Sequence, residues 1–499
     1  MLTSLTLVAF VGVGRVYAQQ PTDTVRLKEV EVAATRLNTF LAGTKVQRID
    51  STTLARYATL DLGDLLANES PVFVKSYGLG SLATTSFRGG SANHTAILWN
   101  GFNIGSPMNG QVDLSLVPVG VANEVSIQYG GTSALWGSGA VGGTVLLNNV
   151  PQFGRGIQVD GGLTFGSFGD RRQRLRVEVP QGRSITSVAV YNADAENDFT
   201  YRTGGVERTQ RNASLERRGV VVEQHLRLNA DQYVSLRYWY QAADRHIPPT
   251  RLQDVSTAFQ QDASHRGTLE WKRVHGRWDT QVRAAWFDER LDWHASADAA
   301  SELSRSRTII AEADVRYAPA GLHTLDLGVN NTYAQALADG YPDKPRQDRA
   351  ALFASYRYRP KGGRFVGSAA ARQELLDGQA VPFTGSLGGE YRLLERVILK
   401  AQMARVYRVP TFNDLYWRPG GTPTCCRRTG TAATSALYGI KPSNSCPCAA
   451  RSPGSTGRWT TGSSGCPDPP TGAHATSCRS GAADGKCVRN WRGPGVPPP

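Results

Sequence analysis

Cysteine is missing from most of this chain. No cysteine precedes Cys425, and all seven cysteines lie in the last part of the sequence. The main body therefore folds without disulfides. In the tail, a CC pair followed by a CxC pair matches no zinc-ligand spacing, and an odd number of cysteines cannot all pair with one another.

Long apolar runs and catalytic motifs are also missing. No segment reaches the roughly 20 apolar residues of a membrane-spanning helix, so a membrane role would require β-strands. The sequence has no GxSxG or HExxH motif, and its eight histidines are scattered. We therefore expect no enzymatic activity, no catalytic residues, no metal site and no cofactor.

The charge is unevenly distributed. The formal net charge is +14, and residues 424–499 contribute half of this excess, with nine Lys and Arg against two Asp. No basic helix interleaved with aromatic residues occurs elsewhere. The charge therefore does not indicate nucleic-acid binding.

The amino-terminal residues 1–18 have the features of a signal peptide. Residues 5–14 form an apolar core, and Val16 and Ala18 supply the small side chains expected before a cleavage site. The basic residues that usually begin such a segment are missing, so either the start lies upstream or the signal is weak. A buried strand is the alternative interpretation.

Residues 37–86 predict short helices and strands. Ser51 is expected to cap a first helix, and the leucines of 60–66 have helical spacing. Residues 71–75 read as a strand. Such a mixture predicts a small α/β unit.

The stretch 87–147 contains the most distinctive pattern of the chain. A turn comes first, then a short apolar strand that ends at a second turn, then two β-rich runs joined by a glycine-rich loop. Glycine permits positive φ and close approach of the backbone, so the pattern predicts a tight strand–loop–strand unit. The motif residues are Arg88, Gly89, Gly90, Asn100, Gly101, Glu124, Gly130, Gly137, Gly142 and Gly143.

In this order, these residues resemble the plug domain of TonB-dependent outer-membrane receptors. Two departures are mild: Gly131 stands where the family usually has proline, and Trp136 where it has tyrosine. The resemblance implies a plug over 37–150 and a Ton box within the segment 19–36, where the chain pairs as an added strand with a TonB-type energy-transducing protein. We place the box at Leu27, Lys28, Glu29, Val30, Glu31, Val32 and Ala33. Without the resemblance, an ordinary first strand would also explain its partial alternation.

From residue 156 to residue 408, segments of alternating character are separated by turns. Long strands with aromatic ends favour a transmembrane β-barrel, with an apolar outer face and a polar inner face; a soluble β-sandwich or propeller is the alternative. The aromatic-girdle candidates are Tyr238, Trp239, Trp271, Trp278, Trp286 and Trp293. About 13 strands are predicted: 157–165, 172–179, 185–191, 220–228, 233–240, 268–274, 280–287, 308–317, 324–331, 350–358, 365–371, 383–391 and 397–406.

Connections between these strands differ in length, and the long ones include 193–218 and 241–264. Asp194, Glu196 and Asp198 form an acidic cluster in one of them. Calcium needs oxygen ligands that converge from several positions, so we expect a solvated acidic loop here.

Residues 405–421 again resemble the receptor family, and most closely its BtuB-like cobalamin-receptor branch, which continues with Asn-Pro-Asp-Leu-x-Pro-Glu. If one adenine is removed from codons for Asn-Pro-Asp-Leu-Leu-Pro-Glu-Asp, the new frame spells Thr-Pro-Thr-Cys-Cys-Arg-Arg-Thr, which is the sequence of 422–429. We therefore expect a partial barrel over 151–421 and an out-of-frame tail over 422–499. A genuine low-complexity extracellular tail is the alternative.

The resemblance implies an α/β plug inside an antiparallel transmembrane β-barrel, which has about 22 strands in plugged transporters. It also implies TonB-dependent import of a scarce small ligand, cobalamin or a related compound, across the outer membrane of a Gram-negative bacterium. A ferric-siderophore receptor and a non-transporting surface protein or adhesin are the alternatives. The expected partners are a TonB-type protein, outer-membrane lipid and the ligand. A partial barrel leaves unpaired backbone groups in lipid, so the product as written is expected to be non-functional.

Overall fold

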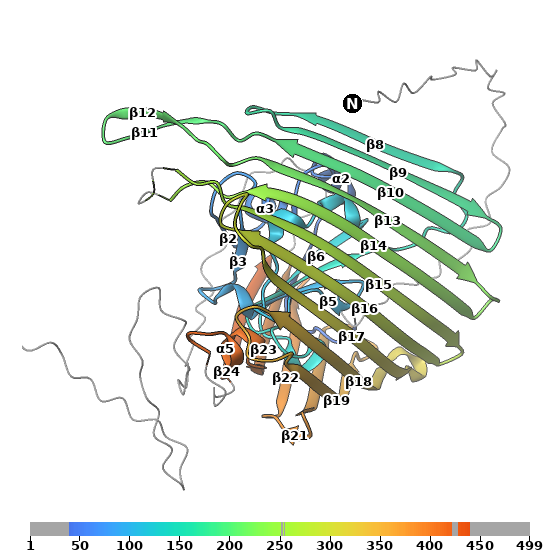
Figure 1. Cartoon of the computed structure of the whole chain (residues 1–499). Coiled ribbons are helices and arrows are strands. Elements are labelled where there is room, and N and C mark those ends of the chain that lie inside the picture. The colour runs from blue at the N-terminus through green and yellow to red at the C-terminus, as the bar shows by residue number, and fades with distance from the viewer. Residues whose placement is uncertain (1–38, 251–252, 254, 422–427, 440–499) are drawn as a thin grey trace, which may run out of the picture.

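A computed structural model describes residues 39–250, 253, 255–421 and 428–439. A small plug unit packs against the inner face of a large, curved antiparallel sheet (Figure 1). The predicted signal peptide and Ton box lie outside the described residues. Among the described residues, no helix is both long enough and apolar enough to cross a membrane.

The plug is built around a five-stranded sheet in the order β1-β6-β7-β4-β5. Strands β4 and β7 run parallel, and the other neighbours are antiparallel. A separate hairpin, β2–β3, projects from this unit. The elements are β1 (Lys45–Arg48), α2 (Ser51–Arg56), α3 (Leu62–Glu69), β2 (Phe73–Ser76), β3 (Ala83–Ser86), η1 (Ala92–His94), β4 (Thr95–Trp99), β5 (Phe102–Asn103), η2 (Leu114–Leu116), η3 (Val119–Val121), β6 (Glu124–Tyr129), α4 (Ser133–Trp136) and β7 (Gly143–Asn148).

Aspartate side chains begin the two longer plug helices. The side chain of Asp50, rather than the predicted Ser51, accepts the capping hydrogen bond of α2, from the N–H of Thr53 at 2.9 Å. Asp61 caps α3 by accepting from the N–H of Asp64 at 3.0 Å. Both caps satisfy backbone donors that the first helical turn leaves free.

The large sheet is a continuous antiparallel path of neighbouring strands from β8 to β24. These two strands stand at the ends of the order and do not pair with each other within the described residues. Its strands are β8 (Gln158–Phe165), β9 (Arg171–Gln181), β10 (Ser184–Ala195), β13 (Leu215–Arg227), β14 (Gln232–His246), β15 (Phe259–His275), β16 (Trp278–His294), β17 (Glu302–Tyr317), β18 (His323–Ala338), β19 (Arg346–Tyr358), β20 (Phe365–Leu376), β22 (Thr384–Leu394), β23 (Val397–Arg408) and β24 (Arg428–Gly439).

Smaller elements lie in the connections of this sheet. The hairpin β11 (Thr200–Thr203) and β12 (Val206–Thr209) occupies the long connection after β10 and projects far from the sheet (Figure 1). The others are η4 (Pro319–Gly321), β21 (Gln379–Ala380) and α5 (Phe412–Tyr416). Short turns and longer connections alternate along the chain, which places the long connections together at one end of the sheet.

The predicted strands are confirmed, and most extend further than expected. Each of the 13 predicted segments overlaps a strand of the sheet, and β15 and β16 each reach 17 residues. These lengths exceed the roughly 9–11 residues that one membrane crossing needs. The additional strand, β24, lies in the predicted out-of-frame tail. Backbone pairing requires no particular side chains, so this strand does not test the reading frame.

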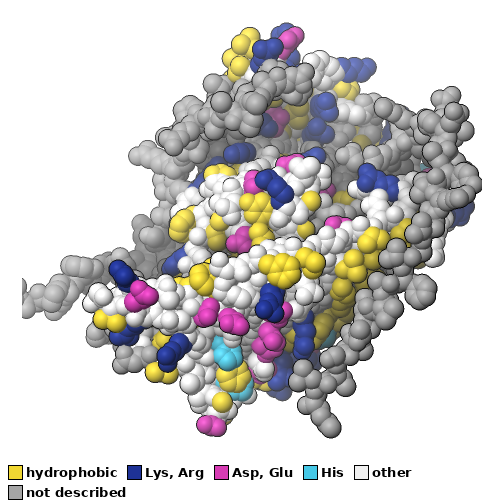
Figure 2. Space-filling view, turned by 90° about the horizontal axis from the view of Figure 1, so that it is seen from above, with side chains coloured by type: hydrophobic (Ala, Val, Ile, Leu, Met, Phe, Trp, Pro, Cys, Tyr) yellow, Lys and Arg dark blue, Asp and Glu magenta, His cyan; other side chains and the backbone are white. Residues whose placement is uncertain are grey.

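Side chains alternate between the two faces of the sheet as predicted. On β14, Ser235 and Arg237 are buried on the plug side, whereas Leu236 between them is 53% exposed on the outer side. Figure 2, which views the molecule from above, shows apolar side chains interspersed with charged ones on the visible surface. Trp239 is not a girdle residue, because it is fully buried on the inner face, with its ring centroid 5.6 Å from that of Trp99 in the plug.

One apolar core joins the plug to the sheet. Leu62, Leu65 and Leu66 of α3 are fully buried with Trp99 of β4, and Trp239 of the large sheet belongs to the same cluster. The plug therefore packs against the wall as well as around its own sheet.

Candidate functional site

The glycine-rich motif shapes the backbone of the plug. Arg88 and Gly89 have φ values of 52° and 77°, and Asn100 and Gly101 have 49° and 88°. Positive φ strains most L residues, and glycine and asparagine tolerate it best. These four residues therefore form the two predicted tight turns.

The last motif glycines allow close packing. A Cβ atom added to Gly143 would lie 2.3 Å from Cδ1 of Phe87, and one added to Gly142 would lie 3.0 Å from Cβ of Phe87. Gly130 follows β6 with a φ value of 118°, and Gly137 caps the end of α4 with a φ value of 82°. Glu124 begins β6, away from this contact.

Two motif glycines also face arginines of the large sheet. A Cβ atom on Gly101 would lie 2.3 Å from a guanidinium nitrogen of Arg283, and one on Gly137 would lie 3.3 Å from a guanidinium nitrogen of Arg372. The motif thus brings the plug turns close to the charged inner wall.

A buried polar network holds the end of the plug to the wall. The side-chain amide of Asn149 donates to the carbonyl oxygen of Val121 at 2.8 Å and to Glu223 Oε1 at 2.7 Å. Asn149 Oδ1 accepts from Asn100 Nδ2 at 3.0 Å. On the wall side, Glu223 also accepts from Arg176 at 3.1 Å. A motif residue, Asn100, is therefore linked to the large sheet through Asn149.

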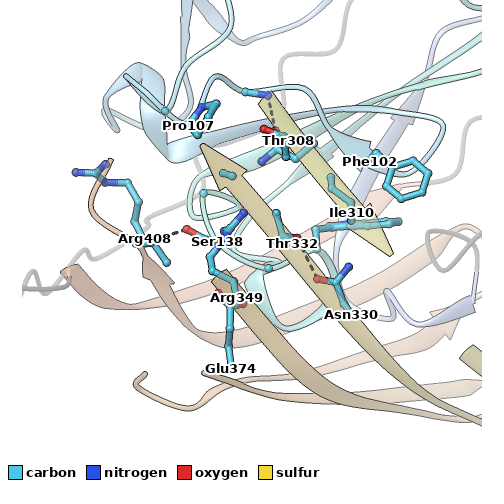
Figure 3. A pocket seen from close by; sticks show the side chains of 18 of the residues that line it. Phe102, Pro107, Ser138, Thr308, Ile310, Asn330, Thr332, Arg349, Glu374 and Arg408 are labelled. Atoms are coloured by element: carbon cyan, nitrogen blue, oxygen red, sulfur yellow. Dashed lines mark hydrogen bonds between the residues drawn. The ribbon is translucent and has the colours of Figure 1, made fainter. Parts of the chain in front are cut away.

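A cavity of about 120 Å³ lies between the plug and the large sheet (Figure 3). The plug contributes uncharged residues from its 101–110 and 135–139 segments, together with Asn93. The wall contributes polar and charged side chains from β17 to β20 and β23. The charged residues of the lining are Glu312, Arg349, Arg372, Glu374 and Arg408.

Plug and wall also meet where the chain leaves β23. Carbonyl oxygens of Pro107 and Met108 accept from the backbone N–H groups of Phe412 at 3.0 Å and Asn413 at 2.8 Å. Gly110 and Thr411 both line the cavity. The plug loop around 107–110 therefore borders the cavity beside α5.

Asp414 of α5 is kept ionised beside the cavity. Burial alone would raise its pKa, but the Thr411 N–H and the Arg408 guanidinium outweigh burial and hold the pKa below its usual value. Asp414 accepts from Arg408 at 2.9 Å. This ion pair closes the α5 side of the cavity lining.

Asp61 in the plug is perturbed in the opposite direction. Burial, followed by the neighbouring Asp64 carboxylate, raises the pKa of Asp61 to about 7. Arg172 of the wall lies 3.9 Å away. The charge of this plug helix cap therefore depends on pH.

The predicted acidic cluster of Asp194, Glu196 and Asp198 lies at the end of β10 and in the connection that follows it. Among the described residues, no group of three or more His, Cys, Asp or Glu is placed to hold a metal ion. Asp194 lies next to the last residue of β10 and accepts from Asn192 at 2.5 Å.

The sequence indicated the plug motif but not the wall residues of the cavity. Arg349, Arg372 and Glu374 lie just beyond the predicted segments 350–358 and 365–371, where β19 and β20 extend further than expected, and each has the inward phase of the alternation. The sequence feature that could have indicated these wall residues is a charged side chain at an inward position of an alternating strand. Alternation alone does not say which inward residues lie opposite the plug turns.

Comparison with known proteins agrees with this architecture. The family described as "TonB-dependent Receptor Plug Domain" matches residues 41–144. The chain is 24% identical over 374 residues to "Vitamin B12 transporter BtuB" of Photobacterium profundum, covering 72% of this chain and 59% of that protein. It is 23% identical over 438 residues to the protein of the same name from Vibrio vulnificus, covering 85% and 68%. The chain thus spans about three fifths of the length of the first relative.

Solved structures share the fold at low identity. A mutant of the ferric enterobactin receptor PfeA from Pseudomonas aeruginosa matches with a TM-score of 0.66 and 16% identity, over 79% of this chain and 69% of that chain. "Copper transporter OprC" matches with a TM-score of 0.65 and 16% identity, over 80% and 71%. These relatives are transporters and receptors rather than enzymes. The match shows a TonB-dependent receptor plug domain at residues 41–144, and the plug and sheet together have the fold of these solved receptors.

Proposed function

We propose that this receptor imports a scarce small ligand across the outer membrane of a Gram-negative bacterium. The observation that carries the proposal is the cavity between the plug loops and the inner wall. Its position means that a bound ligand would touch both the plug and the wall. A movement of the plug would then change the ligand's contacts, which import requires.

The work of moving the plug would come from a TonB-type partner. Strand addition uses main-chain hydrogen bonds and needs an extended segment with a free edge. The box at Leu27–Ala33 has that character in the sequence. Its attachment ahead of β1 would transmit a pull to the plug sheet.

Cobalamin or a related corrinoid is the first candidate ligand. The support is the resemblance of 405–421 to the cobalamin-receptor branch and the similarity to two vitamin B12 transporters. A ferric siderophore is the second candidate, supported by the fold shared with siderophore receptors. Both are bound without covalent chemistry, so the proposal needs no catalytic group.

Uptake and binding together test this function. The gene, with its reading frame restored at codon 422, would be expressed in cells that lack their own cobalamin and siderophore receptors, and uptake of each labelled ligand would be measured. We expect uptake of one ligand, abolished by Val30→Pro, because proline removes a backbone donor from the added strand. Thr22→Pro, outside the box, is the matched control and should leave uptake intact.

The result separates import from other surface roles. Binding without uptake, unchanged by Val30→Pro, would indicate a non-transporting surface protein. Absence of both binding and uptake would contradict the import proposal.

A further inference from the structure

We propose that Arg349 is the anion contact of the plug–wall cavity, and that the ligand presents an acidic oxygen group to it. This inference rests on the proposed import function and narrows its ligand class. The group is the phosphodiester of a corrinoid, or a carboxylate or catecholate of a ferric chelate. These sources share one chemistry, a negatively charged oxygen that can accept from a guanidinium.

Most charged side chains of the cavity already have protein partners. Glu374 accepts from Arg372 Nε at 3.4 Å and from the Tyr407 hydroxyl at 2.5 Å. Glu312 pairs with Arg283 and accepts from Asn330 Nδ2 at 3.1 Å. Both carboxylates of the lining are therefore engaged. Arg408 pairs with Asp414 through Nη2, although its Nε and Nη1 atoms are buried without a partner.

Arg349 differs from these groups. Within the described part of the chain it makes no hydrogen bond and no ion pair, and its Nε atom is buried without a partner. Its cross-strand neighbours are Thr332 on β18 and Leu376 on β20, and neither carries a charge. A guanidinium stays charged at all physiological pH values, and a buried donor without an acceptor is unfavourable. An acceptor supplied by a ligand would remove this penalty.

The plug side of the cavity supplies no negative charge. Every plug residue of the lining is uncharged, including Asn103, Ser106 and Ser138. The lining as a whole has three arginines and two glutamates, an excess of one positive charge. In Figure 3, Arg349 lies among the labelled lining residues, with Glu374 drawn beside it. Arg349 therefore belongs to a lining whose plug side carries no charge.

The size of the cavity limits what enters it. Pockets for whole small molecules usually measure about 300–1,000 Å³, whereas this cavity measures about 120 Å³. It therefore fits one substituent of a ligand, and an arginine selects a substituent with paired acidic oxygens.

The test uses the purified full chain in detergent micelles and three probes. Cyanocobalamin carries a phosphodiester, a ferric tricatecholate carries several negative charges, and an uncharged ferric trihydroxamate carries none. Each probe is titrated at low and high salt against the unmodified chain, Arg349→Gln, Arg349→Lys and Arg357→Gln. Arg357 is the matched control, because it lies on the same strand and the same face but outside the cavity lining.

We expect at least one acidic probe to bind, with an affinity that falls as salt increases. Arg349→Gln should weaken that binding about tenfold or more, since hydrogen bonds to charged groups are among the stronger ones. Arg349→Lys should lose less, and Arg357→Gln should match the unmodified chain. The acidic probe that binds identifies the source of the anionic group. Binding of cyanocobalamin indicates a corrinoid, and binding of the tricatecholate indicates a ferric chelate.

Three results would overturn the inference. If Arg349→Gln and Arg357→Gln bind an acidic probe equally well, Arg349 is not the contact. If the uncharged trihydroxamate alone binds, the ligand class is wrong while import still stands. If no probe binds the purified chain although cells that express the frame-restored gene take up a labelled ligand, the inference fails and the proposed function stands. The salt dependence of the unmodified chain keeps the test decisive even if a variant does not fold.

Discussion

Replacing Asn149 with alanine should loosen the plug from the large sheet. The substitution removes the acceptor of Asn100 Nδ2 and the side-chain donor of the Val121 carbonyl, and both groups are buried. Glu223 also loses one donor but keeps Arg176. A buried polar group without a partner costs about 1–3 kcal/mol, so two such groups predict a loss of about 2–6 kcal/mol in the free energy of plug opening.

Hydrogen exchange of the plug amides measures this opening. A loss of about 2 kcal/mol corresponds to roughly 30-fold faster exchange, since about 1.4 kcal/mol is a factor of ten. Strands β4, β6 and β7 should show it. Asn68→Ala is the control, because the Asn68 side chain is exposed and bonds only within its own helix. Equal exchange in Asn149→Ala and Asn68→Ala would refute the argument that this network fastens the plug to the wall.

Four further predictions concern the plug, the outer face and the gene. The raised pKa of Asp61 means that its contribution to plug stability is full below about pH 4 and is lost as the pH rises towards 7; denaturant titrations of Asp61→Asn should show this pH dependence flattened, and an unchanged profile would contradict the assignment. Gly143→Ala should destabilise the plug by about 1–3 kcal/mol through overpacking against Phe87, whereas Gly156→Ala, which meets no atom within 4 Å, should have little effect on the unfolding midpoint. Leu352→Arg, at an outward side chain that is 64% exposed, should cost about 2–4 kcal/mol if it faces the bilayer centre, measured as refolding stability in lipid vesicles; no loss there would place this residue outside the membrane. Resequencing the gene across codons 415–435 should restore one nucleotide at codon 422 and read Asn-Pro-Asp-Leu-Leu-Pro-Glu, and an unchanged sequence would make the tail a genuine part of the product.

Local sequence patterns were sufficient to predict 13 strands of the large sheet, although they did not predict the short strands β11, β12 and β21. An alternating strand shows its period of two wherever one face is apolar and the other polar, so the strands from β8 to β23 were predicted without knowing their neighbours. The plug turns were predictable for a similar reason. A tight turn needs residues with positive φ, which glycine adopts readily, and Gly89 and Gly101 have positive φ in the structure.

The contacts that make a site depended on the tertiary structure. The alternation of polar and apolar residues indicates which side chains of a strand share one face. It does not predict which plug residues lie opposite Arg349 or Trp239. Trp239 illustrates this, since an aromatic residue near a strand end suggested the membrane girdle until the curvature of the sheet placed it against Trp99. The cavity combines plug and wall residues from Asn93 to Thr411.

The sequence by itself therefore determined the elements, the plug motif and the family resemblance, because each depends on residues close together in the chain. The tertiary structure decided the Asn149–Glu223 network, the unpaired guanidinium of Arg349 and the cavity between plug and wall. These depend on the register of many strands and on how the curved sheet encloses the plug, and both are set by packing between residues far apart in the sequence.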